Sequence, residues 1–461
     1  MADESDHPHS STCAVVLAAG MGTRMKSKHP KMLHTLAGRF LIDRCVETAV
    51  RVAGRPPVVV VGHGAELVHE AIGERARFVL QAERLGTGHA VLQAEAAVGD
   101  AAQVIVTYGD MPLLTPETLH QLVHLRERTN AAVAMLTLIS DTPRGFGRVI
   151  RDAQGERVLA VIEEVSCTPE QLAICELNVG AYCFDGAWLW PALKRIRPNS
   201  QKGEYFLTDL IALAVADDRE VRAVVTDDRD ECIGINTRVD LADAEAALRR
   251  RINRRHMLNG VTIVDPATTY IDDQVEIGAD TVILPNTHLV GNTRIGSDCQ
   301  IGPNSYVVAS VIGDRVCVVQ SMIEESRVAD DVHIGPFSHL RPGAQVGSHV
   351  HIGNFAEIKN STLGAGSHMG HFSYLGDATV GKGVNLGAGT ITCNFDGVKK
   401  NRTVIGDHAF IGSDTLLVAP VTVGDRARTG AGAVVTRDVP EDTLAVGLPA
   451  RVIRRLGDPK A

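Results

Sequence analysis

A glycine-rich turn near the start of the chain gathers residues suited to bind phosphate. Residues 17–25 read LAAGMGTRM, and Pro30 and Lys31 follow. Small residues and glycines let backbone N–H groups approach a phosphate or a nucleobase closely, and a following helix adds its positive end. The spacing matches neither a Walker A loop nor a dinucleotide-binding fingerprint. Arg24 and Lys31 beside the same turn therefore indicate an anion site of another kind.

A second set of reactive side chains lies between residues 340 and 400. A purely structural segment would not need so many polar and charged side chains. They are Arg341, Lys359, His371, Tyr374 and Asn385. An imidazole has an ordinary pKa of about 6.5 and can therefore accept or donate a proton near neutral pH. The cluster therefore indicates a binding or catalytic site rather than a purely structural segment.

The segments before residue 260 predict an α/β domain. The expected elements are strands at 13–20, 57–64 and 103–110 and helices at 41–52, from Gly88 and from Pro116. Buried strands that alternate with helices are typical of a mostly parallel sheet. Such sheets place their ligands at the carboxyl ends of the strands, where Tyr108 and Asp110 stand.

Aliphatic residues recur at every sixth position after residue 260. The first run is Ile271, Ile277, Ile283, Leu289, Ile295, Ile301 and Val307, and the register resumes at Val328, Leu363 and Ile405. Glycine commonly follows the aliphatic position, where a chain turns a corner. The hexad predicts a prism-like parallel β-helix that sends one aliphatic side chain from each short face into a narrow shaft. Each coil is covered only by its neighbours, so we expect caps at the ends.

Glycine usage changes near residue 260 and suggests the domain boundaries. Of the 44 glycines, 26 lie in residues 260–461, whereas both tryptophans precede that point. We expect a disordered tail at 1–11, an α/β domain at 12–236, a linker helix at 237–259 and the β-helix at 260–461.

The composition excludes several classes of protein. Lys and Arg number 46 against 55 Asp and Glu, and the net charge of −9 argues against broad binding to nucleic acid or to an anionic membrane. Nine scattered cysteines without zinc spacing fit reduced thiols in a cytosol, with no disulfides and no structural zinc. The first apolar run is too short for a signal peptide or a membrane span. We expect a soluble cytoplasmic protein.

The motifs of the first half resemble those of the sugar-1-phosphate nucleotidyltransferases. The resemblance implies that Arg24 and Lys31 are catalytic cations and that Asp110 and Asn236 hold Mg²⁺. It also implies that the amide of Gln81 pairs with uracil. The residues that it assigns to UTP and the UDP-sugar are Leu17, Ala18, Ala19, Gly20, Gln81, Gly86, Thr87, Tyr108, Gly147, Glu163, Asn178 and Asn236.

The hexad resembles the hexapeptide-repeat acyltransferases, whose left-handed β-helices form trimers with active sites between subunits. The segments around His371 are similar to glucosamine-1-phosphate acetyltransferase domains, which makes His371 the general base and Glu357 a candidate to orient it. The residues implied to bind glucosamine phosphate are Arg341, Lys359, Tyr374, Asn385 and Lys400. Those implied to bind acetyl-CoA are Ala388, Asn394, Phe395, Ser413, Ala431 and Leu448.

Together, residues 12–455 resemble the bifunctional enzymes that combine N-acetylglucosamine-1-phosphate uridylyltransferase with glucosamine-1-phosphate N-acetyltransferase. The resemblance implies a homotrimer with Mg²⁺ as cofactor and acetyl-CoA and UTP as co-substrates. The β-helix would acetylate glucosamine 1-phosphate, and the α/β domain would couple the product to UTP with release of pyrophosphate. The UDP-N-acetylglucosamine would feed envelope or glycan synthesis.

Three residues depart from the pattern of this family. Phe395 replaces a common Tyr, Leu448 replaces an Arg that reaches the CoA phosphates in some members, and Val165 replaces a usual Lys. Because of Phe395 and Leu448, one alternative is a nucleotidyltransferase whose β-helix no longer transfers an acetyl group. A non-catalytic assembly subunit is the other alternative. Asp110 and Asn236 speak against it, because a scaffold needs no metal site.

Overall fold

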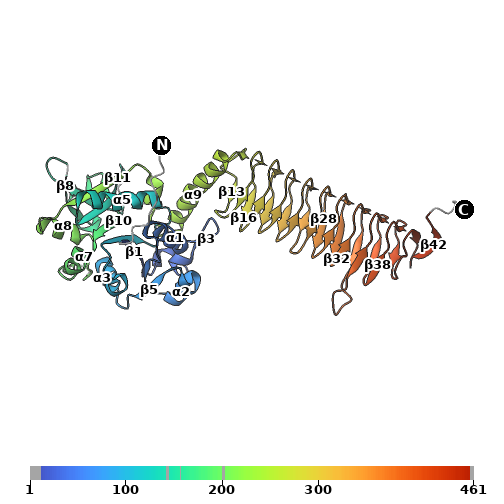
Figure 1. Ribbon diagram of the computed structural model, residues 1–461, viewed down its shortest axis with the longest axis horizontal. Helices are drawn as coiled ribbons and strands as arrows, with labels where there is room; N and C mark the ends of the chain where they lie inside the picture. The colour runs from blue at the N-terminus through green and yellow to red at the C-terminus, as the bar shows by residue number, and fades with distance from the viewer. Residues whose placement is uncertain (1–11, 142–144, 156, 200–202, 457–461) are drawn as a thin grey trace. The chain divides into compact units, whose positions relative to one another are not determined.

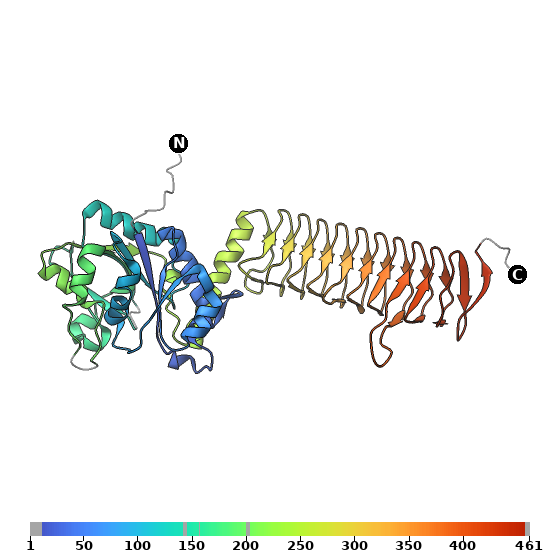
Figure 2. The same ribbon diagram turned by 60° about the horizontal axis from the view of Figure 1, so that its bottom comes forward.

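The structure is a computed structural model that describes residues 12–141, 145–155, 157–199 and 203–456 (Figures 1 and 2). The chain divides into two compact units, Met1–Leu248 and Arg249–Ala461. The tail expected at 1–11 lies outside the described residues. In the described part of the chain, no helix is both long enough and apolar enough to cross a membrane.

A nine-stranded mixed sheet forms the centre of the first unit. Its strands are β1 (Thr12–Ala18), β4 (Val58–Val61), β5 (Arg77–Leu80), β6 (Gln103–Tyr108), β7 (Val133–Ile139), β8 (Gly147–Arg151), β9 (Val158–Ile162), β10 (Glu176–Asp185) and β11 (Val221–Thr226). The order is β11-β7-β10-β6-β1-β4-β5, with β8 and β9 attached to β10. Only β10 runs antiparallel to its neighbours along this order. The predicted α/β class with a mostly parallel sheet is confirmed.

Helices cover both faces of the sheet, which explains why β1 is apolar throughout. Val15 and Leu17 of β1 belong to one core, and Val16 and Ala18 belong to the other. Successive side chains of a strand point to opposite faces, so a strand covered on both sides needs apolar residues at every position. The helices on the second core are α1 (Leu41–Ala53), α2 (Ala65–Ile72) and α5 (Pro116–Thr129), and those on the first are α3 (Thr87–Gln93), α4 (Glu95–Val98), α7 (Gly186–Leu193) and α8 (Asp209–Ala216).

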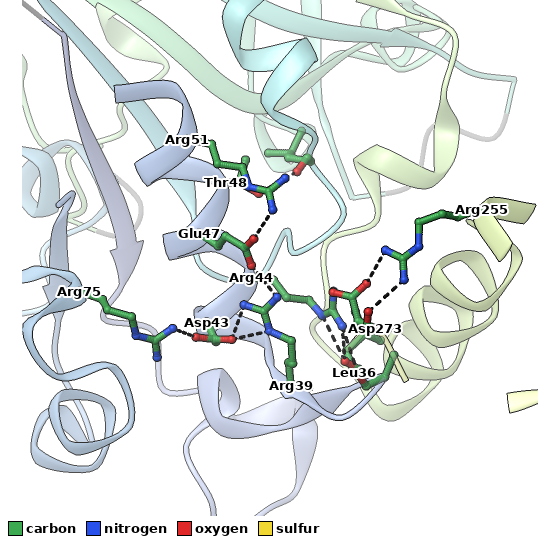
Figure 3. A network of polar contacts seen from close by, with 12 residues as sticks. Leu36, Arg39, Asp43, Arg44, Glu47, Thr48, Arg51, Arg75, Arg255 and Asp273 are labelled. Atoms are coloured by element: carbon green, nitrogen blue, oxygen red, sulfur yellow. Dashed lines mark hydrogen bonds and ion pairs between the residues drawn. The ribbon is translucent and has the colours of Figure 1, made fainter. Parts of the chain in front are cut away.

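Charged side chains at the start of α1 hold the hairpin that follows Lys31 (Figure 3). The hairpin consists of β2 (Thr35–Leu36) and β3 (Arg39–Phe40). The buried Arg44 donates from Nη2 to the carbonyl oxygen of Leu36 at 2.9 Å. Arg39 Nη1 forms an ion pair with Glu47 Oε2 at 2.5 Å. These contacts fix the hairpin that follows Lys31 against α1.

The second unit consists of coils of three short strands, one in each of three sheets (Figure 2). The first sheet has 12 strands, from β12 (Thr262–Ile263) to β42 (Arg451–Arg455). The second has ten, from β13 (Tyr270–Ile271) to β40 (Val434–Val435), and the third has nine, from β14 (Glu276–Ile277) to β38 (Val421–Val423). Ile283 pairs in parallel with Ile301, which lies three hexads further along the chain. The unit is the left-handed parallel β-helix that the hexad and the family resemblance predicted.

The aliphatic residue of each hexad fills the shaft, as predicted. All seven residues of the first run are buried except Ile277. Ile277 lies in the terminal strand of the third sheet and is half-buried. We call the turn from the first sheet to the second the first corner, and the turn from the second sheet to the third the second corner.

Both ends of the shaft are capped. The expected connecting helix is α9 (Arg238–Leu258). Its buried Asn253 donates from Nδ2 to the carbonyl oxygens of Pro266 at 3.0 Å and Thr269 at 3.2 Å, at the start of the first coil. At the other end, β42 returns antiparallel to β41 (Thr443–Val446) and covers its edge.

We expect Gly353→Ala to destabilise the β-helix. A Cβ on Gly353 would lie 1.9 Å from the carbonyl oxygen of Gly370 on the next coil, and the backbone can yield only if the coils separate. Overpacking of this kind costs about 1–3 kcal/mol, so the melting temperature of the unit should fall measurably in thermal unfolding followed by circular dichroism. Gly370→Ala is the matched control, because nothing lies within 4 Å of its Cβ position. Equal losses in the two variants would contradict the prediction.

Candidate active sites

A cleft of about 490 Å³ lies at the carboxyl ends of the parallel strands in the first unit. The predicted site residues that line it are Leu17, Ala19, Gly20, Arg24, Lys31, Gln81, Gly86, Thr87, Tyr108 and Asp110. Ala18 instead packs in the core. Arg84, Glu204 and Phe206 line the same cleft but were not predicted from the sequence. Glu204 and Phe206 could not be found from spacing, because they lie far along the chain from every predicted motif of the cleft.

Two oxygen-bearing side chains and two cations meet in this part of the unit. The Ile235 N–H donates to the carbonyl oxygen of Asp110 at 2.9 Å, which brings Asn236 next to Asp110. Lys31 Nζ forms a close ion pair with the Asp110 carboxylate and donates to Asn236 Oδ1 at 3.2 Å. Arg24 Nη2 donates to the same oxygen at 2.9 Å. The four predicted residues thus form one connected group.

The oxygen atoms of Asp110 and Asn236 fit a magnesium ion. Mg²⁺ prefers oxygen ligands and is commonly held by one or two protein groups together with substrate phosphates. Among the described residues, no three His, Cys, Asp or Glu side chains form a group that could hold a metal. One carboxylate and one amide would therefore need phosphate oxygens to complete the coordination, which would couple metal binding to nucleotide binding.

Gln81 is buried beside a turn that only glycine can make. Its Nε2 donates to the carbonyl oxygen of Gly86 at 3.1 Å. Gly86 has a φ of +99°, and a Cβ there would lie 2.5 Å from the carbonyl oxygen of Tyr205. The Gly88 N–H donates to that same carbonyl at 2.8 Å. The glycines predicted from the sequence therefore let the segment around Tyr205 pack onto the turn.

The predicted sugar contacts are not among the residues that line the cleft. Asn178 on β10 pairs with Gly147 on β8, so these two lie side by side. Asn178 Nδ2 donates to the hydroxyl of Tyr182 at 2.7 Å. Glu163 Oε1 accepts a hydrogen bond from the Thr208 hydroxyl at 2.9 Å. Each predicted polar side chain is thus already held by a neighbour.

Tyr108 lies near members of both the predicted sugar contacts and the predicted metal-ligand pair. Burial raises the pKa of Tyr108, and the charges of Glu163 and Asp110 raise it further. Glycine at position 180, with a φ of +95°, makes room for the ring, because a Cβ there would lie 2.6 Å from the Cε2 atom of Tyr108. Tyr108 therefore lies within electrostatic range of both groups.

Three predicted sugar-phosphate residues lie on successive coils of the β-helix. Arg341 follows β25 (His339–Leu340), Lys359 ends β28 (Ala356–Lys359), and Tyr374 lies in β31 (Ser373–Gly376). These three strands are neighbours in the second sheet. Arg341 Nη1 donates to Glu357 Oε1 at 2.8 Å. Glu357, the candidate to orient His371, thus contacts Arg341 within the chain.

A charged group forms at the second corner. The ammonium group of Lys400 lowers the pKa of Lys359, because two like charges lie side by side. Asp377 accepts hydrogen bonds from Asn360 Nδ2 at 2.7 Å and Asn394 Nδ2 at 2.6 Å. Burial opposes ionisation of Asp377, but these bonds and the two lysines outweigh it and lower its pKa. Asp377 was not predicted from the sequence, because its partners contact it only when the coils stack.

His371 lies at the first corner in a column with four predicted acetyl-CoA residues. The first four, one from each successive coil, are His371, Ala388, Ser413 and Ala431, and Leu448 follows in the turn after β41, where the chain returns as β42. Backbone hydrogen bonds join neighbouring corners, as from the Gly432 N–H to the Ser413 carbonyl oxygen at 2.8 Å. Coils are about 4.8 Å apart, so the column extends for about 19 Å. The stacking thus aligns residues that are far apart in sequence.

Within one chain, His371 lies at the opposite end of β31 from the second corner. His371 precedes β31, whereas Lys359 pairs with Gly376 at the end of that strand. Gly376 follows His371 by five positions of extended chain, which corresponds to roughly 15 Å. Asn385 lies in β33 (Asn385–Leu386) of the first sheet, whereas Tyr374 lies in the second. The predicted acetyl-transfer residues therefore form separate groups within one chain.

The three departures from the family pattern all lie at the surface. Phe395 is exposed and forms an isolated bridge with Lys400 in the loop between β34 (Ile391–Cys393) and β35 (Thr403–Ile405). Leu448 is exposed beyond β41, and Val165 is exposed in the 3₁₀ helix η4 (Glu164–Ser166). Because none of them packs in a core, each can be changed without disturbing the fold.

Comparison with known proteins matches both units to known families. Residues 14–171 match the MobA-like NTP transferase domain, and residues 274–309, 325–360 and 402–437 match the bacterial transferase hexapeptide (six repeats). The chain is 47% identical over 434 residues to the bifunctional protein GlmU of Heliobacterium modesticaldum, covering 94% of each chain. It is 45% identical over 435 residues to the protein of that name from Streptococcus gordonii, covering 94% of this chain and 95% of the relative. For the Enterococcus faecalis protein the identity is 46% over 440 residues, covering 95% and 96%.

Proposed function

The chain belongs to the family of bifunctional GlmU proteins, and we propose that it catalyses two reactions in the synthesis of UDP-N-acetylglucosamine. The second unit transfers the acetyl group of acetyl-CoA to the amine of glucosamine 1-phosphate. The first unit transfers the uridylyl group of UTP to N-acetylglucosamine 1-phosphate and releases pyrophosphate. The observation that carries the proposal is the connected group of Asp110, Asn236, Arg24 and Lys31 in the same chain as the column that begins at His371.

Uridylyl transfer needs no protein nucleophile. A phosphate oxygen of N-acetylglucosamine 1-phosphate attacks the α-phosphorus of UTP, and the bond from that phosphorus to pyrophosphate breaks. The protein contributes position and charge neutralisation. Arg24 and Lys31 bring two positive charges to the reacting phosphates. A Mg²⁺ ion held by Asp110 and Asn236 would neutralise further phosphate charge.

We assign Gln81 to the uracil and the residues around Tyr108 to the sugar. Gln81 Nε2 donates to Gly86, so its carbonyl oxygen is the atom that would accept the uracil N3–H. The carboxylate of Glu163 and the amide of Asn178 can bind sugar hydroxyls. Gly147 has no side chain, so the backbone beside Asn178 can approach the acetyl group.

Acetyl transfer needs a base and a support for acetyl-CoA. The amine of glucosamine 1-phosphate attacks the thioester carbonyl, CoA leaves as its thiolate, and the amine loses a proton. We propose that His371 takes this proton. The small side chains of Ala388, Ser413 and Ala431 would support the pantetheine arm along the column. Beyond Leu448, the arginines of β42 are the nearest cations along the chain for the CoA phosphates.

We propose that the acetyl site is completed between copies of a homotrimer. The amine and the phosphate of the sugar are on adjacent carbons, so one sugar phosphate cannot span the roughly 15 Å between His371 and the end of β31. The first corner also carries Phe337, Phe355 and Phe372, each more than half exposed. Exposed apolar rows mark surfaces that another chain covers. The trimer would place the first corner of one copy beside the second corner of another.

We place both reactions in the cytoplasm, because UTP and acetyl-CoA are the co-substrates. The product would serve the synthesis of envelope glycans such as peptidoglycan.

A two-part assay on the purified chain tests the function. It measures CoA release with glucosamine 1-phosphate and pyrophosphate release with N-acetylglucosamine 1-phosphate. We expect both. Pyrophosphate release alone would leave a uridylyltransferase with a silent β-helix and would make Phe395→Tyr and Leu448→Arg the first variants to examine, whereas neither activity would overturn the proposal.

A further inference from the structure

The first turn of α9 holds the backbone of Asn236. Asp240 Oδ2 accepts two hydrogen bonds, one from the Asn236 N–H at 2.9 Å and one from the Thr237 N–H at 2.7 Å. The Asp240 N–H donates in return to Thr237 Oγ1 at 3.2 Å. Thr237 and Asp240 therefore form a reciprocal capping box at the start of the helix.

The bond from Asn236 goes beyond what a helix cap requires. A capping box pairs the N–H of the cap residue, here Thr237, and the N–H of the third helical residue, here Asp240. Asn236 precedes the cap and belongs to neither position. The Asp240 carboxylate thus reaches one residue further, to the residue whose side chain lies beside Asp110.

Other contacts fix the rest of the Asn236 segment. The Ile235 N–H is bound by the carbonyl oxygen of Asp110 at 2.9 Å. Asn236 Nδ2 donates to the carbonyl oxygen of Gly234 at 3.4 Å, and Oδ1 accepts the hydrogen bond from Arg24. Hydrogen bonds thus hold the backbone N–H groups of residues 235–237 and the side chain of Asn236. Together they orient the Asn236 Oδ1 atom.

We propose that Asp240 is a positioning residue for the magnesium site and acts through the backbone of Asn236. The inference rests on the proposed function, because it takes Asp110 and Asn236 as the metal ligands. A metal ligand binds well when its oxygen is already oriented, and loss of an outer partner typically weakens metal binding by roughly 10–100-fold. Loss of the Asp240 carboxylate would release the Asn236 N–H and let its amide oxygen move away from Asp110.

Binding of Mn²⁺ in the presence of UTP tests this proposal directly. Electron paramagnetic resonance of free Mn²⁺ gives the dissociation constant for the full-length chain without turnover. We expect Asp240→Ala to weaken Mn²⁺ binding by about 10-fold. Asp240→Asn retains an acceptor oxygen and should stay close to wild type. Thr237→Ala removes the other half of the capping box while leaving the carboxylate in place, so it should lower thermal stability but not Mn²⁺ affinity.

Steady-state kinetics give a second readout. In Asp240→Ala, the Mg²⁺ concentration for half-maximal uridylyl transfer should rise about 10-fold, while saturating Mg²⁺ restores most of kcat and acetyl transfer is unchanged. Equal weakening of Mn²⁺ binding in Thr237→Ala would reduce Asp240 to a helix cap and overturn the proposal. An Asp240→Asn variant as weak as Asp240→Ala would also overturn it, because charge rather than position would then matter. Absent Mn²⁺ binding in the wild-type chain would instead overturn the proposed magnesium site itself.

Discussion

Replacing His371 by Ala should reduce acetyl transfer by roughly 10²–10⁴-fold while leaving uridylyl transfer nearly unchanged. The amine must lose a proton as it attacks the thioester, and the imidazole of His371 is the base that we propose for this step. The loss should appear in kcat more than in the KM for acetyl-CoA, because Ala388, Ser413 and the later residues of the column remain. CoA release and pyrophosphate release, measured on the same preparation, check the prediction.

His349→Ala is the matched control for this variant. His349 lies in another turn of the β-helix with its side chain 72% exposed, near Asp331. Its removal should leave both activities intact. A His371→Ala variant that keeps its acetyl transfer would refute the assignment of the base. If the same variant lost uridylyl transfer equally, the cause would be misfolding or a coupled site.

Replacing Asp110 by Asn should reduce uridylyl transfer by roughly 10²–10³-fold and leave acetyl transfer intact. Asn has nearly the same shape but no charge, so it loses the ion pair with Lys31 and the anionic oxygen for Mg²⁺. Metal assistance contributes several kcal/mol to the stabilisation of transition-state charge, which corresponds to this range of rates. Pyrophosphate release at increasing Mg²⁺ concentration measures the effect, and high Mg²⁺ should restore only part of it.

Asp141→Asn makes the same chemical change at a surface position. The side chain of Asp141 is 83% exposed and pairs only with the exposed Arg229 among the described residues. Uridylyl transfer should therefore be unaffected in this control. Undiminished activity in Asp110→Asn would mean that the metal is held elsewhere in the cleft. The two catalytic variants also control for each other, since each should spare the reaction of the other unit.

Local patterns in the sequence were enough to predict both architectures. The hexad identified the β-helix because each hexad forms one flat face and three hexads complete one coil. Ile283 and Ile301 lie three hexads apart and pair as this arrangement requires. The apolar run of β1 identified a strand covered on both faces. The turn at 17–25 and the position of Asp110 at a strand end pointed to the cleft of the first unit, because neighbouring residues and strand ends can be identified from the sequence.

Contacts across coils and between distant segments were decided only by the tertiary structure. Asp377 contacts Asn394 because the length of each coil sets which residues stack. Lys400 reaches the same corner from an insertion that interrupts the six-residue repeat, so the repeat does not predict its position. Likewise, the Asp240 carboxylate accepts the Asn236 N–H only because α9 begins at Arg238, which places Asp240 in its first turn. The sequence alone therefore determined the fold class of each unit, because fold class follows from local periodicity. The reaction class and the candidate residues came from the resemblance of its motifs to known families. The tertiary structure decided which candidates meet, because that depends on register and on side-chain direction.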